Sequence, residues 1–86
     1  MEVHSSARKH GISDDDIAHS VEHALVEYEF GGDDSASRTL VLGPDRAGNM
    51  LEVIVLELAD DRMLAIHAMP PRPAFHDLLP SGDDDG

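Results

Sequence analysis

The chain has 86 residues, with six lysine and arginine residues against 18 acidic ones, a formal net charge of −12 and no cysteine. This length allows a single domain with a modest core, and the lack of cysteine excludes disulfides and thiolate chemistry. The acidic balance repels nucleic acid at long range and favours a basic protein partner.

Two helices are predicted before the first strand. Val3–His10 is expected to form a short helix with Gly11 as its C-cap. Ser13 is expected to cap a second helix that runs to about Ala24, because Asp16 follows at the capping-box spacing and neighbouring aspartates suit the helix dipole. Its buried face is predicted from the apolar positions Ile17, Val21, Ala24 and Leu25.

Four consecutive strands are predicted after these helices. The first alternates apolar and acidic side chains, and the third is a long apolar run that fits a central strand covered on both faces. Because the connecting turns are short, neighbouring strands should be antiparallel. The expected strands are Leu25–Phe30, Arg38–Gly43, Met50–Leu58 and Met63–Met69, with turns at Gly31–Ser35, Pro44–Asn49 and Ala59–Arg62.

The chain beyond the last strand is rich in proline, which ends a strand. One or two helical turns are predicted at Ala74–Leu79, and Ser81–Gly86 is expected to be a disordered acidic tail. The sequence therefore predicts one α+β domain over residues 1–80, in which N-terminal helices pack on a four-stranded antiparallel sheet and a short C-terminal helix follows.

The candidate chemistry centres on His67, which lies in an otherwise apolar strand that should exclude imidazole unless a partner satisfies it. Glu52, on the neighbouring strand, could lie about one diagonal step away and fix the tautomer of the ring for acid–base work. A one-residue change of register would separate the two. Alternatively, the ring packs on the helices and bonds a backbone carbonyl. On its own strand, His67 is expected to share a face with Met63, Ala65 and Met69.

Several cations could accompany His67. Arg72 follows two prolines, and a rigidly held guanidinium suits a phosphate or a carboxylate, although it could equally be a surface arginine paired with one of the many acids. Lys9 and His10 end the first predicted helix, where positive charge is favourable in any case. Arg38 and Arg46 are further cations.

His19 and His23 have the i, i+4 spacing that can chelate a metal ion on a helix. They lie opposite the apolar face, and no third histidine has a ligand-like spacing, so a solvent-facing pair is the preferred interpretation and no metal or cofactor is expected. His76 could join a site around His67 or face solvent.

Four segments, in this order, resemble the BrnT-type toxins of bacterial type II toxin–antitoxin modules, within the RelE/ParE superfamily. The similarity spans roughly Arg8 to Arg72, is most specific in the first segment, and implies a RelE-like fold. The segments are Arg8–Ser13 (RKHGIS), Arg38–Gly43 (RTLVLG), Gly48–Val53 (GNMLEV) and Ile66–Arg72 (IHAMPPR).

The resemblance implies an endoribonuclease that needs no metal. In that chemistry a base removes the ribose 2′-hydroxyl proton, cations hold the scissile phosphate, and an acid protonates the leaving 5′-oxygen. The positions that match the family's active-site segments are Lys9, His10, Arg38, His67 and Arg72. The implied partner is an antitoxin of the ribbon-helix-helix type, and the chain could also form a homodimer.

The strongly negative charge also suggests a second possible function. The same fold could be a weakly active or inactive module whose acidic surface binds a basic protein. Either protein is expected in the cytoplasm, because no apolar run reaches the length of a membrane span and no signal peptide is visible at Met1–His10.

Overall fold

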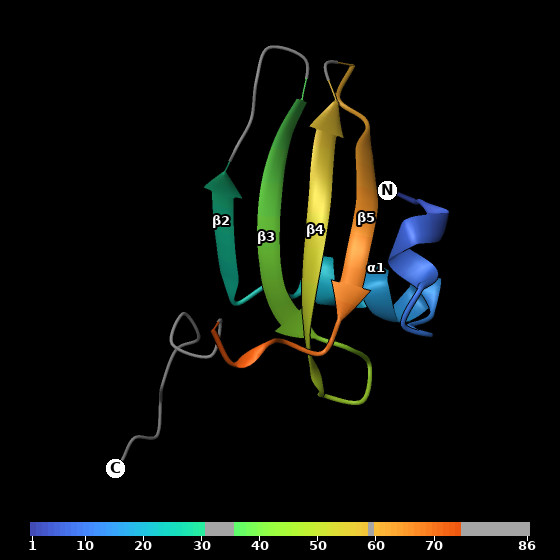
Figure 1. The fold of residues 1–86 in the computed structure, drawn as a ribbon, viewed down its shortest axis with the longest axis vertical. Helices are drawn as coiled ribbons and strands as arrows, with labels where there is room; N and C mark the ends of the chain where they lie inside the picture. The colour runs from blue at the N-terminus through green and yellow to red at the C-terminus, as the bar shows by residue number, and fades with distance from the viewer. Residues whose placement is uncertain (31–35, 59, 75–86) are drawn as a thin grey trace.

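A computed structural model describes residues 1–30, 36–58 and 60–74 of the chain. Its class is α+β, as predicted, with one α-helix and a five-stranded mixed sheet (Figure 1). None of the helices among these residues has the length and apolar character needed to span a lipid bilayer. The elements are β1 (Glu2–Val3), the 3₁₀ turn η1 (Ser5–Arg8), α1 (Asp14–Glu22), β2 (Val26–Phe30), β3 (Ala36–Pro44), β4 (Met50–Leu58) and β5 (Met63–Met69).

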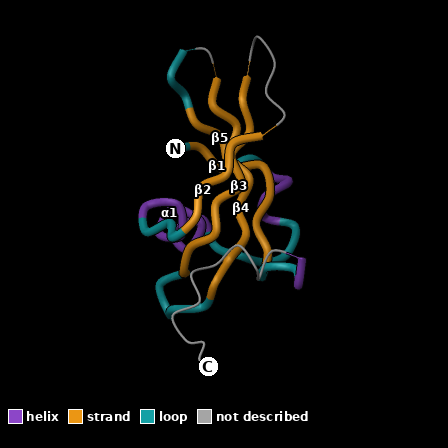
Figure 2. The backbone as a smooth tube through the Cα atoms, turned by 90° about the vertical axis from the view of Figure 1, so that its left-hand side faces the viewer, coloured by secondary structure: helices purple, strands orange, loops and turns teal. Residues whose placement is uncertain are grey.

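The strands lie in the order β1-β5-β4-β3-β2. β2 to β5 form an antiparallel meander, and β1 adds to the far edge in parallel with β5. α1 lies against one face of the sheet, where it contacts β3 and β4. It passes behind the strands in Figure 1, and the turned view places it on one side of them (Figure 2). The meander explains the confirmed antiparallel pairing, because each short turn returns the chain beside the strand it has just left.

One hydrophobic core fills the space between α1, η1 and the sheet. It is built from small and branched side chains, which suits the close packing of one helix on three strands. Ser13 caps α1 as predicted, its side chain accepting a hydrogen bond from the backbone N–H of Asp16. The buried core residues are Ala7, Ile17, Val41, Leu51, Val53, Val55, Ala65 and Ala68.

The backbones of α1 and β3 touch at Gly43. The Ser20 hydroxyl donates a hydrogen bond to the Gly43 carbonyl oxygen at 2.8 Å, and both residues are buried. A Cβ atom at position 43 would collide with the Ser20 carbonyl oxygen. Glycine at this position therefore sets how closely the helix can approach the sheet.

The predicted first helix is wrong. The chain instead forms β1, then the short η1, and Val3 pairs with Ala65 at the edge of the sheet. The backbone N–H of His4 continues this pairing by donating to the Ala65 carbonyl oxygen at 2.9 Å. An eight-residue helix has little intrinsic stability, and covering the β5 edge satisfies more of the backbone.

The second helix is shorter than predicted, because α1 ends at Glu22 with His23 as its C-cap. Ile17 is fully buried and Val21 and Ala24 pack against the core, but Leu25 is 57% exposed rather than buried. Four antiparallel strands were expected and five are present in a mixed sheet, so this part of the fold prediction is also wrong. The predicted helix at Ala74–Leu79 and the tail at 81–86 lie outside the described residues beyond Ala74.

A bulge in β5 reverses the expected face of His67. Ile54 pairs with His67, whereas Val55 pairs with Ala65, so Ile66 has no partner across the ladder. Ala65 and Met63 therefore pack into the core, while His67 faces the opposite side of the sheet. The prediction that His67 shares a face with Met63 and Ala65 is wrong for this reason.

We expect Gly43→Ala to destabilise the chain by about 3 kcal/mol, because a methyl group meets the helix backbone and α1 must shift. Gly48→Ala is the matched control: its site is open space, and only its positive φ of 92° penalises a side chain, by about 1 kcal/mol. Urea unfolding of both variants measures the difference. A Gly43→Ala chain as stable as the parent would contradict the described packing of α1 on β3.

Candidate active site

Glu52 is the most unusual residue of the sheet, because its charged side chain is 0% exposed. It points from β4 to the face opposite α1, as shown by its register partner Met69 and by the pairing of Ile54 with His67 on that same face. A carboxylate removed from water is costly unless several donors surround it. The site is therefore defined by what bonds this carboxylate.

Two side chains bind the same oxygen of Glu52. His67 Nε2 lies 2.8 Å from Glu52 Oε2, and Arg72 Nη2 lies 2.9 Å from that atom. The Arg72 backbone N–H donates to Glu52 Oε1 at 2.9 Å, and its Nε is 3.1 Å from Oε2. The imidazole and the guanidinium are thus neighbours across one carboxylate.

Two local features of the chain bring these donors to Glu52. The bulge at Ile66 turns the His67 ring to the face opposite α1, and the chain then leaves β5 through Pro70 and Pro71, which cannot continue the ladder. The segment passes the lower end of the sheet in Figure 1, so that the backbone and side chain of Arg72 both reach Glu52.

The electrostatics of Glu52 reflect two opposed effects. Burial raises the pKa of Glu52, but hydrogen bonds from the backbone and side chain of Arg72 and from His67 lower it, and the balance holds the pKa below its ordinary value of 4.5. The carboxylate is therefore ionised near neutral pH and can only accept hydrogen bonds. His67 Nε2 must then carry a proton, which leaves Nδ1 to exchange a proton with a ligand.

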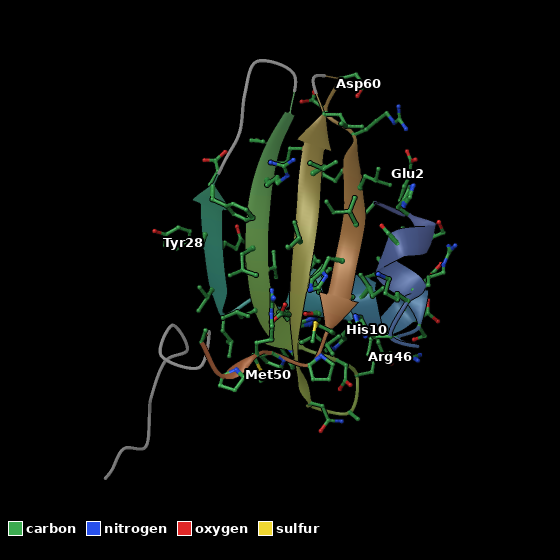
Figure 3. All side chains as sticks on the ribbon, viewed as in Figure 1. Glu2, His10, Tyr28, Arg46, Met50 and Asp60 are labelled. Carbon is green, nitrogen blue, oxygen red and sulfur yellow. The ribbon has the colours of Figure 1, made fainter. Side chains whose placement is uncertain are left out.

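A second imidazole stands beside the first. His10, in the turn after η1, is exposed and meets His67 edge-to-face with ring centroids 6.2 Å apart and planes at 76°. Figure 3 shows its place at the lower end of β5. The side chain of His67 is 26% exposed and that of Arg72 53%, so the cluster is open to solvent on one side.

The other predicted site residues differ in position. Lys9 precedes His10 and is exposed. Arg38 lies on β3 opposite Leu56, four residues along the strand from Leu42, which pairs with Glu52. At about 3.4 Å per residue, the backbone of Arg38 lies roughly 14 Å along the strand from that of Leu42. The structure therefore brings together Glu52, His67, Arg72 and His10, but not Arg38.

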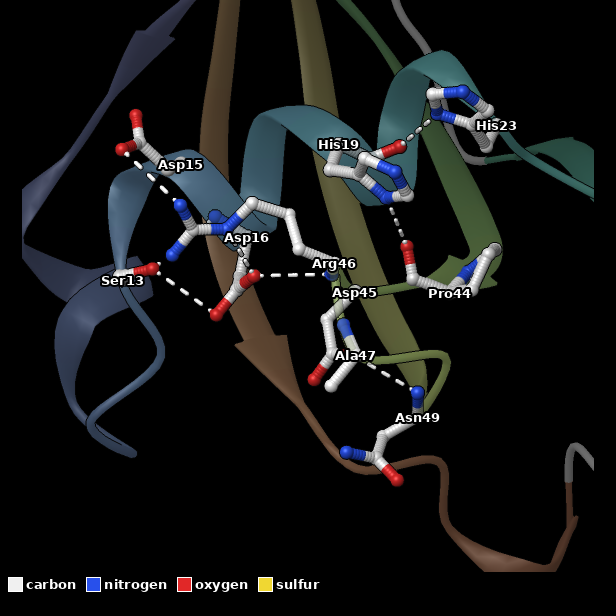
Figure 4. A network of polar contacts seen from close by, with 10 residues as sticks. All are labelled: Ser13, Asp15, Asp16, His19, His23, Pro44, Asp45, Arg46, Ala47 and Asn49. Carbon is white, nitrogen blue, oxygen red and sulfur yellow. Dashed lines mark hydrogen bonds and ion pairs between the residues drawn. The ribbon is translucent and has the colours of Figure 1, made fainter.

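His19 and His23 form a stack rather than a chelating pair. Their rings lie 4.0 Å apart with planes at 19°, and their Nδ1 atoms contact the carbonyl oxygens of Pro44 at 2.9 Å and of His19 at 3.0 Å (Figure 4). A metal ion binds in the plane of an imidazole ring, and two nearly parallel planes do not meet at one ion. His23 is exposed as expected, but His19 is partly buried against Pro44.

No group of three or more histidine, aspartate or glutamate side chains among the described residues is arranged to hold a metal ion. Arg46, another cation considered from the sequence, bonds Asp16 Oδ1 through Nε at 2.8 Å and lies near Asp15 (Figure 4). His76 lies outside the described residues.

The chemistry open to the cluster around Glu52 is proton transfer by an imidazole beside a guanidinium that can bind an anion.

No residue pattern indicated one contact of this cluster, in which the backbone N–H of Arg72 donates to Glu52. The two prolines before Arg72 indicated a fixed direction of the chain, but not which carboxylate it would meet. Comparisons with models of known protein families, with curated proteins and with solved structures find no match. Any statement of function therefore depends on the site itself.

We expect Glu52→Gln to destabilise the chain by about 1.5–3 kcal/mol, the range for hydrogen bonds that involve a charged group. The amide keeps the shape of the side chain but cannot accept all four donors. Glu57→Gln, at an exposed position near the end of the same strand, should change the free energy of unfolding by less than about 0.5 kcal/mol. Equal stability of the two variants in urea would show that the Glu52 contacts contribute nothing.

Comparison of the parent chain with Glu52→Gln also predicts how the free energy of unfolding depends on pH. Because the folded-state pKa of Glu52 lies below its ordinary value of 4.5, its ionisation stabilises the fold above that pH. The stabilisation is lost as the pH falls through the lower folded-state pKa. The difference in unfolding free energy between the parent and Glu52→Gln should therefore shrink in acid. A difference that stays constant down to complete protonation would contradict the assignment of an ionised Glu52.

Proposed function

We propose that this chain is a BrnT-type toxin with a RelE-like fold, which cleaves RNA in the cytoplasm without a metal ion. The observation that carries the proposal is the shared Glu52 oxygen, which places an imidazole and a guanidinium side by side at a solvent-open end of the sheet. These are the two groups that cleavage by 2′-hydroxyl attack requires, one to move protons and one to face the phosphate.

The proposed step begins with His67. Glu52 holds its Nε2, and Nδ1 takes the proton of the ribose 2′-hydroxyl. The 2′-oxygen then bonds to phosphorus, the bond from phosphorus to the 5′-oxygen breaks, and protonated His10 gives its proton to the leaving oxygen. The products are a 2′,3′-cyclic phosphate and a 5′-hydroxyl. Glu52 is a positioning residue, because it acts through His67 and Arg72 rather than on the RNA.

Arg72 is proposed to bind the scissile phosphate. Its side chain is 53% exposed although it bonds Glu52, so a phosphate can approach the guanidinium from solvent. A guanidinium carries five N–H donors in a fork that matches phosphate oxygens, and its contact with Glu52 fixes the orientation of that fork. Arg38, on the account of the strand register, has no part in this step.

The resemblance to the toxins supports the same cluster. Of the four segments that carry it, Arg8–Ser13 contributes His10, Gly48–Val53 contributes Glu52, and Ile66–Arg72 contributes His67 and Arg72. These segments are far apart in the sequence, yet their polar side chains meet at one end of β5. A cognate antitoxin of the ribbon-helix-helix type is the partner proposed on this basis.

A second function is favoured by the charge. At least four of the six lysine and arginine residues form ion pairs with carboxylates of the same chain, so most of the acidic excess remains for a partner. The second candidate is an acidic interaction module of the same fold that binds a basic protein and has little or no nuclease activity. The paired cations are Arg8, Arg46, Arg62 and Arg72.

The first function predicts cleavage of RNA by the purified chain in excess chelator, with a cyclic phosphate at the new end. We expect His67→Ala to reduce the rate by about 10²-fold or more, and His10→Ala to reduce it comparably, because each removes a proton-transfer group. His23→Ala, at an exposed imidazole outside the cluster, is the matched control and should cleave at the parent rate.

The substrate provides a further control. An RNA with a single 2′-deoxynucleotide at the cleaved position should stay intact, because the attacking oxygen is missing. RNA left whole by the folded parent chain would refute the nuclease and leave the interaction module. Cleavage that persists in His67→Ala would show that another site, or another protein, is responsible.

A further inference from the structure

We propose that β2 is a docking edge, to which an extended segment of a partner protein adds as a further strand, with cationic and apolar side chains alternating along it. β2 is the last strand of the sheet, and no described strand pairs with its outer side (Figure 1). The outward N–H and C=O groups of such an edge are free to pair with an incoming strand.

The apolar exposure of the described chain gathers at this edge. Four large hydrophobic side chains are exposed in the described residues, and three of them belong to the six-residue stretch that contains β2. Tyr28 extends away from the sheet in Figure 3. These three are Leu25 at 57%, Tyr28 at 57% and Phe30 at 38%.

The two faces of β2 differ in chemistry. Tyr28 and Phe30 pair with Leu40 and Arg38 and lie on the face opposite α1. The alternate residues Glu27 and Glu29 are exposed on the other face. Because directly opposed side chains share a face, an added strand would meet the glutamates with one row of its side chains and the aromatic rings with the other. Lysine or arginine alternating with valine, isoleucine or threonine matches both rows.

A second copy of this chain does not match the glutamate row and the aromatic row of β2. If β2 paired antiparallel with β2 of another copy about a two-fold axis, a register centred on residue 27, 28 or 29 would place a glutamate opposite a glutamate. Like charges at opposed positions destabilise a pair of strands. With a net charge of −12 on each chain, long-range repulsion adds to this cost. The edge therefore favours a cationic partner over self-association.

This inference deepens the partner side of the proposed function and rests on it, but it does not depend on RNA cleavage. β3 and β4 lie between β2 and β5, the strand that carries His67. The two activities can therefore be removed separately. Charge reversal at β2 should leave RNA cleavage intact, and His67→Ala should leave docking intact.

The test uses the full chain and a nine-residue peptide of alternating lysine and valine, with capped ends. NMR titration should shift the amide signals of β2, and calorimetry should show binding that weakens as salt rises. We expect Glu27→Lys combined with Glu29→Lys to weaken binding by at least about tenfold. Glu22→Lys, an exposed reversal on α1, should weaken it by much less for each charge changed.

Two control peptides separate strand addition from simple attraction of charge. The first carries glutamate in place of lysine and should not bind. The second keeps every charge but is N-methylated at alternate residues, which removes the hydrogen bonds of an added strand, and it should bind at least about tenfold more weakly. Equal binding of the methylated peptide, equal loss in Glu22→Lys, or no shift of the β2 amides would each overturn the proposal.

Discussion

The buried carboxylate of Glu52 is the constraint on which the site and the end of the sheet depend. It lies on the central strand β4, and its ligands come from β5 and from the segment beyond it. A carboxylate that is removed from water is tolerated only while hydrogen-bond donors surround it. Removing one of these donors leaves a buried negative charge without its partner. The contact therefore fixes the path of the chain after β5 as well as the orientation of the His67 ring.

Position and reactivity are linked through this one group. The ion pair that secures Arg72 also determines which nitrogen of His67 carries the proton, because an ionised carboxylate only accepts hydrogen bonds. His10 then adds a second imidazole from the other end of the sequence. One guanidinium and two imidazoles thus gather around a single buried carboxylate, while the far edge of the sheet presents acidic side chains and aromatic rings.

The sequence predicted part of this arrangement well. The alternation in β2, the apolar run of β4 and the Ser13 cap were visible in residue patterns, and the α+β class followed from the order of the elements. The contact of Glu52 with His67 was one of two alternatives and depended on the register of β4 and β5. The bulge at Ile66 was not predictable, because nothing in that apolar stretch marks where the ladder slips. That slip places His67 beside Glu52 and makes the expected sharing of a face with Ala65 wrong. The pairing of β1 was missed because a two-residue strand has no periodicity. Arg38 was grouped with the site by the family resemblance, and the strand register then places it away from Glu52.

The central claim is that an ionised, buried Glu52 holds the Nε2–H of His67, and NMR of the histidine ring nitrogens tests it most directly. At neutral pH the His67 signals should show a proton on Nε2 held against exchange with water, and Glu52→Gln should abolish that protection while leaving the other histidines unchanged. A His67 ring protonated only at Nδ1, or one whose ring signals do not respond to Glu52→Gln, would contradict the account.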